Sequence, residues 1–154
     1  MVFQTQGTIK KAAKAVAAVI KSLGVDPEKS EITAVEGGAA WQIAKGSADV
    51  MIAINPGQDG ATARLRVVSP IVKFDPDLPL GLAERLLELN GARLPGIAFG
   101  TLSGKIVALV AERSVEYLDR AEVEEMLAVI GHYADKYDDL LVDEFGGTRV
   151  CDLK

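Results

Sequence analysis

The stretch KIVALVAERSVEYLDRAEV, residues 105–123, decides how this chain folds. Its first half includes Ile106–Ala111, in which every residue is apolar. Because successive side chains of a strand point to opposite faces, this strand needs cover on both faces. The second half carries a helix start, in which Asp119 is the predicted N-cap and Glu122 completes a capping box. The stretch therefore predicts a buried strand that leads directly into a helix.

Helices on one side of a sheet cover only one face of such a strand. Leaving Val107 and Leu109 in water would forgo about 1.5–3 kcal/mol of burial for each residue. The segment Val50–Ile54 has the same apolar character on both faces. A second subunit, a partner peptide or the last helix wrapped behind the sheet would supply the missing cover, and the residues leave these three covers open.

Three helices are predicted, because apolar residues recur at every third or fourth position. They cover Thr8–Leu23, Pro79–Asn90 and the segment from the Asp119 cap to about Leu141. Gly24 supplies a left-handed cap that ends the first helix. The inner stripe of the second helix consists of Leu82, Leu86 and Leu89. At the start of the third helix, Leu118 is placed to pack onto Val123.

The predicted strands are Glu31–Glu36, Ala39–Lys45, Ala48–Ile54, Ala61–Val68, Ile97–Thr101 and Lys105–Glu112, the first of them a weak addition. Proline has no N–H to donate to a strand ladder, so Ser69-Pro70 is expected to mark a bulge, a sheet edge or a strand end. The glycines that follow Phe145 predict a flexible tail over residues 145–154.

This order of elements predicts an α+β fold. Short connections make neighbouring strands antiparallel, and helices then cover the sheet in a two-layer arrangement. The element order is α-β-β-β-α-β-β-α, in a single domain of residues 1–154 with a core over about residues 8–141.

Composition and charge exclude several classes of protein. Hydrophobic residues make up 49% of the 154 residues, and no run reaches the roughly 20 apolar residues that span a bilayer. The net charge of −5 argues against a nucleic-acid binder, which needs clustered cations. Residues 1–25 nevertheless carry +4, from four lysines and no acid, so the remainder carries −9. Because this segment lacks arginine, we interpret it as the first helix of a cytoplasmic domain and not as a transit peptide.

No catalytic, metal or cofactor site is expected. The single cysteine, Cys151, permits neither an intrachain disulfide nor a cysteine zinc site, and the single histidine, His132, is predicted to be solvated on a helix. Gly100–Lys105 superficially resembles a phosphate loop, but its glycine spacing is one residue short and it leads into a strand. We therefore predict a hairpin turn there. The aromatic residues Trp41 and Phe99 are interpreted as core or interface anchors.

Acidic residues are densest near the end of the last helix, at Asp135, Asp138, Asp139, Asp143 and Glu144. They lack the every-second-residue spacing of a calcium loop. Lysines of the first helix lying opposite would compensate this charge, and a solvated acidic face is the alternative.

Several segments together resemble YbjN-type domains, which are similar in fold to type III secretion chaperones. The segments that carry the resemblance are Arg66–Val72, the leucine-rich helix Leu82–Asn90, the turn and strand Leu94–Gly100, and the long closing helix. The resemblance covers roughly residues 8–141.

The resemblance implies a small, acidic, cytoplasmic protein that forms a homodimer and has no catalytic residues and no cofactor. Secretion chaperones bind an extended, unfolded segment of another protein along apolar patches, whereas other YbjN-type proteins are described as regulators. In the chaperones the second helix and nearby strands contribute to dimerisation. Carried over to this chain, that dimer or partner surface involves Leu82, Leu86, Leu89, Val107 and Leu109.

The leading hypothesis is therefore a non-enzymatic, chaperone- or adaptor-like homodimer that binds a protein or peptide, and neither nucleic acid nor membrane. A regulatory module that binds a small ligand is the alternative, and an enzyme ranks third because no nucleophile, base or metal set assembles from these residues.

Overall fold

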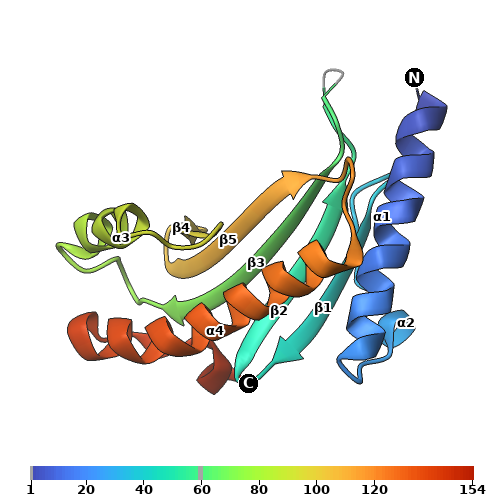
Figure 1. The fold of residues 1–154 in the computed structure, drawn as a ribbon. Coiled ribbons are helices and arrows are strands. Elements are labelled where there is room, and N and C mark those ends of the chain that lie inside the picture. The colour runs from blue at the N-terminus through green and yellow to red at the C-terminus, as the bar shows by residue number, and fades with distance from the viewer. Residues whose placement is uncertain (1, 59–60) are drawn as a thin grey trace. The chain divides into compact units, whose positions relative to one another are not determined.

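The structure of the protein, a computed structural model, describes residues 2–58 and 61–154. Its elements, shown in Figure 1, are α1 (Val2–Ser22), α2 (Pro27–Ser30), β1 (Ala39–Lys45), β2 (Ala48–Asn55), β3 (Arg64–Lys73), α3 (Leu82–Gly91), β4 (Ala98–Leu102), β5 (Ile106–Ser114), α4 (Arg120–Phe145), β6 (Thr148–Arg149) and the 3-10 helix η1 (Val150–Leu153). This confirms the predicted α+β class and the order of the main helices and strands.

The strands form one six-stranded sheet in the order β1-β2-β3-β5-β4, with β6 pairing with β3. Strands β4 and β5 are antiparallel, and Phe99 lies opposite Leu109. The turn between them places Ser103 and Gly104 at φ 51° and 68°, both left-handed. The predicted hairpin over Gly100–Lys105 is therefore confirmed.

Contacts group the chain into two compact units. Unit 1 consists of Met1–Ile43, Met51–Val67 and Glu112–Leu127, and unit 2 of Ala44–Val50, Val68–Ala111 and Ala128–Lys154. The core of unit 1 includes the buried side chains of Ile9, Ala12, Val16, Ile20, Trp41, Ile43, Ile52, Ile54, Leu65 and Leu127. The core of unit 2 includes those of Leu82, Leu86, Leu89, Phe99, Val107, Leu109, Ile130 and Leu141.

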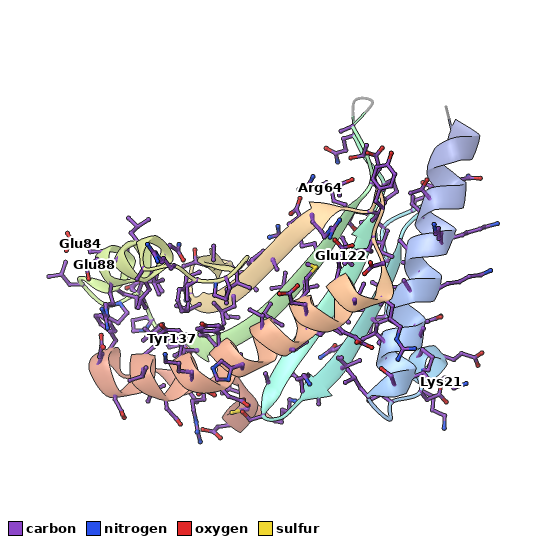
Figure 2. All side chains as sticks on the ribbon, viewed as in Figure 1. Lys21, Arg64, Glu84, Glu88, Glu122 and Tyr137 are labelled. Atoms are coloured by element: carbon purple, nitrogen blue, oxygen red, sulfur yellow. The ribbon has the colours of Figure 1, made fainter. Side chains whose placement is uncertain are left out.

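Helix α1 begins earlier than the predicted Thr8 and ends at Ser22. Gly24 follows at φ 80°, the left-handed conformation that the sequence predicts for the end of this helix. The apolar stripe of α1 lies in the core of unit 1, while its lysines are exposed, as Lys21 shows in Figure 2.

The capping box at the start of α4 is present in both directions. The backbone N–H of Glu122 donates to the Asp119 carboxylate at 2.9 Å, and the N–H of Asp119 donates to the Glu122 carboxylate at 3.0 Å. Leu118 and Val123 are both buried. The helix start predicted from the sequence is therefore confirmed.

Two predicted strands differ from the structure. In the segment Glu31–Glu36, Glu31 alone makes a bridge, with Trp41, before the chain turns at Gly37 with φ 76°. Strand β3 runs through Ser69-Pro70 and lies between β2 and β5, so the strand end and the sheet edge are wrong, whereas the bulge stays a prediction. The Ser69 hydroxyl donates to the Asp49 carbonyl at 2.8 Å, so a side chain maintains a contact next to the proline that lacks an N–H.

Residues 145–154, for which the sequence predicts a flexible tail, contain regular structure. Gly146 and Gly147 adopt φ 77° and 84°, which reverses the chain after α4. Thr148 and Arg149 then pair with Lys73 and Val72 of β3.

Candidate functional site

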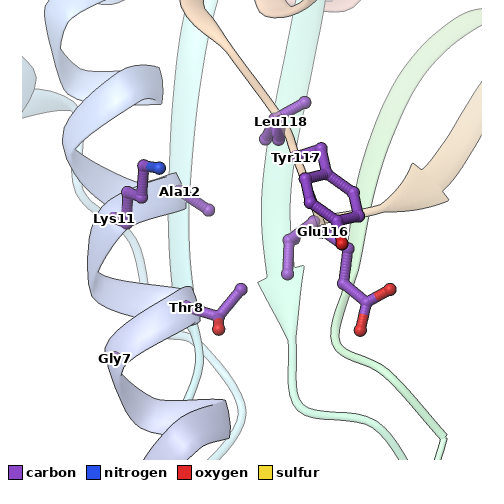
Figure 3. A pocket seen from close by; sticks show the side chains of 8 residues that line it. Gly7, Thr8, Lys11, Ala12, Glu116, Tyr117 and Leu118 are labelled. Atoms are coloured by element: carbon purple, nitrogen blue, oxygen red, sulfur yellow. The ribbon is translucent and has the colours of Figure 1, made fainter.

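Unit 1 contains an open cavity of about 440 Å³ between α1 and the β5–α4 connection (Figure 3). We call it the Tyr117 cavity. It is lined by Gly7, Thr8, Lys11, Ala12, Val115, Glu116, Tyr117 and Leu118. Ala12, Val115 and Leu118 are buried and form an apolar base, whereas Lys11, Glu116 and Tyr117 are exposed. The volume and the mixture of apolar base and polar rim are typical of a binding site.

Tyr117 is the most unusual residue of this cavity. Its side chain is 94% exposed and its backbone has φ 58°, a left-handed conformation that is rare for a bulky residue. The turn is held from both sides, because the N–H of Glu116 donates to the Ser114 hydroxyl at 3.1 Å and the N–H of Leu118 donates to the Val115 carbonyl at 3.2 Å. The fold thus holds Tyr117 in a strained backbone conformation, a feature that clusters at functional sites, and leaves the residue exposed at the cavity wall.

No sequence pattern singled out Tyr117 as a functional residue. The available signal was its place in a short connection, between an apolar strand and the Asp119 cap, where an aromatic residue has no strand or helix face to pack into.

A second hollow, of about 190 Å³, lies in unit 1 beside the edge strand β1. It is lined by Glu31, Ile32, Ala34, Gly38, Ala39, Ala40 and Trp41. The N–H of Ile32 donates to the Ala40 carbonyl at 3.0 Å, so this segment covers part of the β1 edge. Trp41 is buried, in agreement with its interpretation as an anchor, and its indole N–H has no hydrogen-bond partner in residues 2–58 and 61–154. Val35, which lies between the lining residues Ala34 and Gly38 in the sequence, is an exposed apolar residue.

The predicted dimer or partner surface lies inside unit 2. Each of its five residues is at most 8% exposed: Leu82, Leu86, Leu89, Val107 and Leu109. The ring of Phe99, opposite Leu109, packs edge-on against Tyr137 of α4 with centroids 5.1 Å apart. Tyr137 of α4 therefore packs on Phe99 at the sheet face that Leu109 shares.

Helix α3 also carries an exposed apolar residue that its sequence pattern did not predict. Leu87 is 70% exposed, and Leu80 just before the helix is fully exposed. Their signal was weak, because Leu87 lies outside the leucine stripe and Leu80 lies in a proline-rich loop.

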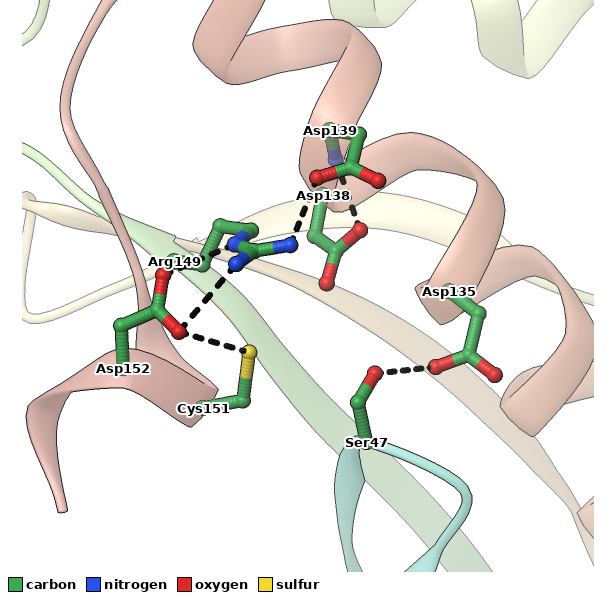
Figure 4. Close-up of polar contacts among 7 residues, drawn as sticks. All are labelled: Ser47, Asp135, Asp138, Asp139, Arg149, Cys151 and Asp152. Atoms are coloured by element: carbon green, nitrogen blue, oxygen red, sulfur yellow. Dashed lines mark hydrogen bonds and ion pairs between the residues drawn. The ribbon is translucent and has the colours of Figure 1, made fainter.

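Three of the acidic residues near the end of α4, Asp135, Asp138 and Asp139, have partners within unit 2 (Figure 4). Asp139 accepts a hydrogen bond from Arg149 at 2.7 Å, and Asp135 accepts one from the Ser47 hydroxyl at 2.5 Å. Burial raises the pKa of the Asp138 carboxyl, which accepts a hydrogen bond from the N–H of Asp139. Within the described residues, no three histidine, cysteine, aspartate or glutamate side chains converge as a metal site requires.

The single histidine and the single cysteine lie on the surface or near it. His132 is exposed, as predicted, and contacts the ring of Tyr133. Cys151 lies in η1, and burial raises the pKa of its thiol, so the thiolate needed for reactivity is disfavoured.

The lysines of α1 form an exposed surface that we call the lysine face, composed of Lys10, Lys11, Lys14 and Lys21. None of the four forms an ion pair with any residue in the part of the chain that the structure describes. In the same part of the chain, no helix is long and apolar enough to span a membrane.

Comparison with known proteins agrees with this architecture. Residues 11–153 match the family TY-Chap1, described as T3SS (YopN, CesT) and YbjN peptide-binding chaperone 1. The fold is similar to a chain in the crystal structure of the ExsC–ExsE complex, with a TM-score of 0.64 and 20% identity over 86% of this chain and 95% of that chain. It is also similar to a chain in the HopA1–SchA chaperone–effector complex, with a TM-score of 0.52 and 18% identity over 82% of this chain and 91% of that chain. No curated protein matches.

Proposed function

Because this chain belongs to the TY-Chap1 family of peptide-binding chaperones, we propose that it binds an extended segment of another protein in the Tyr117 cavity and catalyses no reaction. The family match and the chaperone-like fold support the peptide-binding role. The cavity supports the location, because it combines an apolar base with an exposed aromatic ring.

The exposure of Tyr117 is the observation that carries this proposal. A buried aromatic side chain typically removes about 150–250 Å² from water, worth several kcal/mol at about 25 cal/mol per Å². With its side chain 94% exposed, Tyr117 contributes almost none of this to folding. A partner that covers the ring gains that burial on binding, and aromatic residues are the commonest binding hot spots.

The test measures binding of fluorescein-labelled peptides, about 20 residues long, tiled along proteins that co-purify with this chain. Tyr117→Ala is expected to weaken the best peptide at least about 10-fold, as for a hot-spot residue. Val35→Ala, which also truncates an exposed apolar side chain, is the matched control and leaves binding unchanged. Equal binding by the wild type and Tyr117→Ala would contradict the proposed site.

We also propose that the protein is a cytoplasmic homodimer and that the α3 region contributes to the dimer. The surface predicted at Leu82, Leu86, Leu89, Val107 and Leu109 stays a prediction, and Leu87 adds an exposed apolar residue on the same helix. Light scattering at micromolar concentration is expected to give twice the 16.3 kDa chain mass. Leu87→Asp is expected to shift the mass toward the monomer, whereas Val35→Asp is not.

A small ligand is the second candidate, and the hollow beside Trp41 favours it. Trp41 lines this hollow, and its buried indole N–H has no partner among the described residues, which costs about 1–3 kcal/mol unless the N–H is satisfied. A metabolite-sized ligand that raises the thermal midpoint of the wild type, but not that of Trp41→Phe, would support this role.

A further inference from the structure

We infer that the peptide bound in the Tyr117 cavity is acidic, and that its carboxylates contact the lysine face of α1. This inference rests on the proposed peptide-binding function and specifies the class of peptide. It follows from where the lysines lie, from their lack of partners and from the charges that line the cavity.

The lysines are placed along the helix next to the cavity. At about 100° of rotation per residue, Lys10, Lys14 and Lys21 fall within about 40° of one another and form one line along α1. Lys11 lies next to this line and itself lines the cavity, on the same helix wall as Gly7 (Figure 3). A peptide that enters the cavity therefore runs beside a row of positive charges.

These charges are unusual in unit 1 because they are not neutralised there. The arginines of β3 are paired, since Arg64 and Arg66 contact Glu112 at 3.1 and 2.7 Å. Arg113 is likewise paired, with Glu122. The lysine face has no ion pair among the described residues, although the whole chain has an excess of acids and a net charge of −5.

The residues between the lysines are small, including Ala13 and Ala17, so an extended chain can approach the helix closely.

The cavity lining orients such a peptide. Glu116 lies on the wall opposite Lys11 and repels carboxylates (Figure 3). The acidic side chains of the peptide therefore lie along α1, and its apolar side chains lie against Tyr117. The preferred sequence alternates acidic and apolar residues, because successive side chains of an extended peptide point in opposite directions.

The test compares two fluorescein-labelled peptides, about 16 residues long, in which valine alternates with glutamate or with glutamine. At about 50 mM salt the glutamate peptide is expected to bind about 10-fold more tightly, and about 0.5 M salt should largely remove the difference. Lys10→Gln with Lys14→Gln should weaken the glutamate peptide about 3- to 10-fold and leave the glutamine peptide unchanged. The matched control, Lys29→Gln with Lys105→Gln, makes the same change in net charge and should affect neither peptide.

Each other outcome has a defined meaning. Equal binding of the two peptides would overturn this inference and leave the proposed peptide-binding function intact. If neither peptide bound and the tiled natural peptides also failed to bind, this inference and the proposed peptide-binding function would both be contradicted. If a single-stranded DNA of about 20 nucleotides, or vesicles rich in phosphatidylserine, bound through the same lysines as tightly as the glutamate peptide, the face would recognise polyanions in general and the inference would be overturned.

Discussion

The side chain of Asn90 pairs with both backbone groups of Phe99. The N–H of Phe99 donates to the Asn90 amide oxygen at 2.7 Å, and the Asn90 amide nitrogen donates to the Phe99 carbonyl at 3.2 Å. Phe99 lies on β4, an edge strand of the sheet, so the end of α3 satisfies backbone groups that a neighbouring strand would otherwise pair with. Covering an edge in this way protects a sheet against pairing with other chains.

Replacing Asn90 tests this edge cover. Asn90→Ala leaves the N–H and the carbonyl of Phe99 without this partner and is expected to cost about 1–3 kcal/mol of unfolding free energy. Asn90→Asp keeps the acceptor for the Phe99 N–H but sets a carboxylate oxygen against the Phe99 carbonyl, so its cost should be larger near neutral pH than at a pH where the carboxyl is protonated. Urea denaturation measures the unfolding free energies of both variants. Gln42→Ala, at an exposed position, is the control, and its unfolding free energy is expected to stay within about 0.5 kcal/mol of wild type. A wild-type midpoint for Asn90→Ala would refute the assigned role.

Glu112 is expected to make folding sensitive to acid. Its hydrogen bond with Arg66, followed by that with Arg64, lowers the pKa of the Glu112 carboxyl in the folded state. The unfolded chain therefore binds the proton more readily than the folded one, so ionised Glu112 stabilises the fold. This stabilisation is present above the ordinary pKa of about 4.5 and is lost as the pH falls through the lowered pKa of the folded state. Glu112→Gln should lower the unfolding free energy by about 0.5–1 kcal/mol at pH 7, because the pair is partly exposed.

The pH dependence supplies the check on Glu112. The difference in unfolding free energy between wild type and Glu112→Gln should shrink toward zero at a pH well below the lowered pKa, where the wild-type carboxyl is protonated. Glu125→Gln, at an exposed position, is the control. A difference that is the same at every pH would show that charge plays no part.

Asp138 is expected to act in the opposite direction. Burial is the main cause that raises the pKa of its carboxyl, Asp139 and Asp135 raise it further, and the N–H of Asp139 and the Arg149 guanidinium lower it. The folded state therefore binds the proton more readily than the unfolded chain. Ionised Asp138 therefore destabilises the folded state. This destabilisation develops as the pH rises from the ordinary pKa of about 3.8 through the raised pKa of the folded state.

Asp138→Asn should consequently stabilise the protein at pH 7, because the amide keeps an acceptor oxygen for the N–H of Asp139 and carries no charge. Thermal midpoints of wild type and variant are expected to converge when the pH falls below the ordinary value. Asp143→Asn, exposed on the same helix, is the control that should change little. A thermal midpoint of Asp138→Asn below that of wild type at pH 7 would contradict this explanation.

Arg149 is expected to hold the C-terminal segment against the sheet. Its guanidinium contacts Asp139 at 2.7 Å and Asp152 at 2.8 Å, and the bonds with these carboxylates raise its pKa further above the ordinary value. Arg149→Ala should increase amide hydrogen exchange in β6 and at its partner residues Val72 and Lys73.

Arg149→Lys should give an intermediate exchange rate, since an ammonium keeps the positive charge but cannot make the bidentate hydrogen bonds of a guanidinium. Arg120→Ala, which breaks an exposed pair with Glu124 within α4, should leave exchange in β6 unchanged. Unaltered protection in Arg149→Ala would show that strand pairing alone holds the segment.

Much of the fold is readable from the sequence because its signals are local. The capping box of Asp119 and Glu122 joins residues three apart, and the apolar run Ile106–Ala111 identifies a strand buried on both faces without reference to the rest of the chain. These signals depend on backbone geometry and on alternation, which neighbouring residues determine among themselves.

The tertiary structure decided the features that concern function. The sequence did not indicate that Tyr137 packs against Phe99, the residue opposite Leu109, because these residues are distant in the chain. It likewise did not indicate that Tyr117 stays in solvent or that Lys10 has no acidic partner among the described residues. Exposure and ion pairing depend on which side chains the completed fold brings within a few ångströms of each other. Residue order alone therefore predicts the elements, whereas packing determines which of their surfaces remain free to bind.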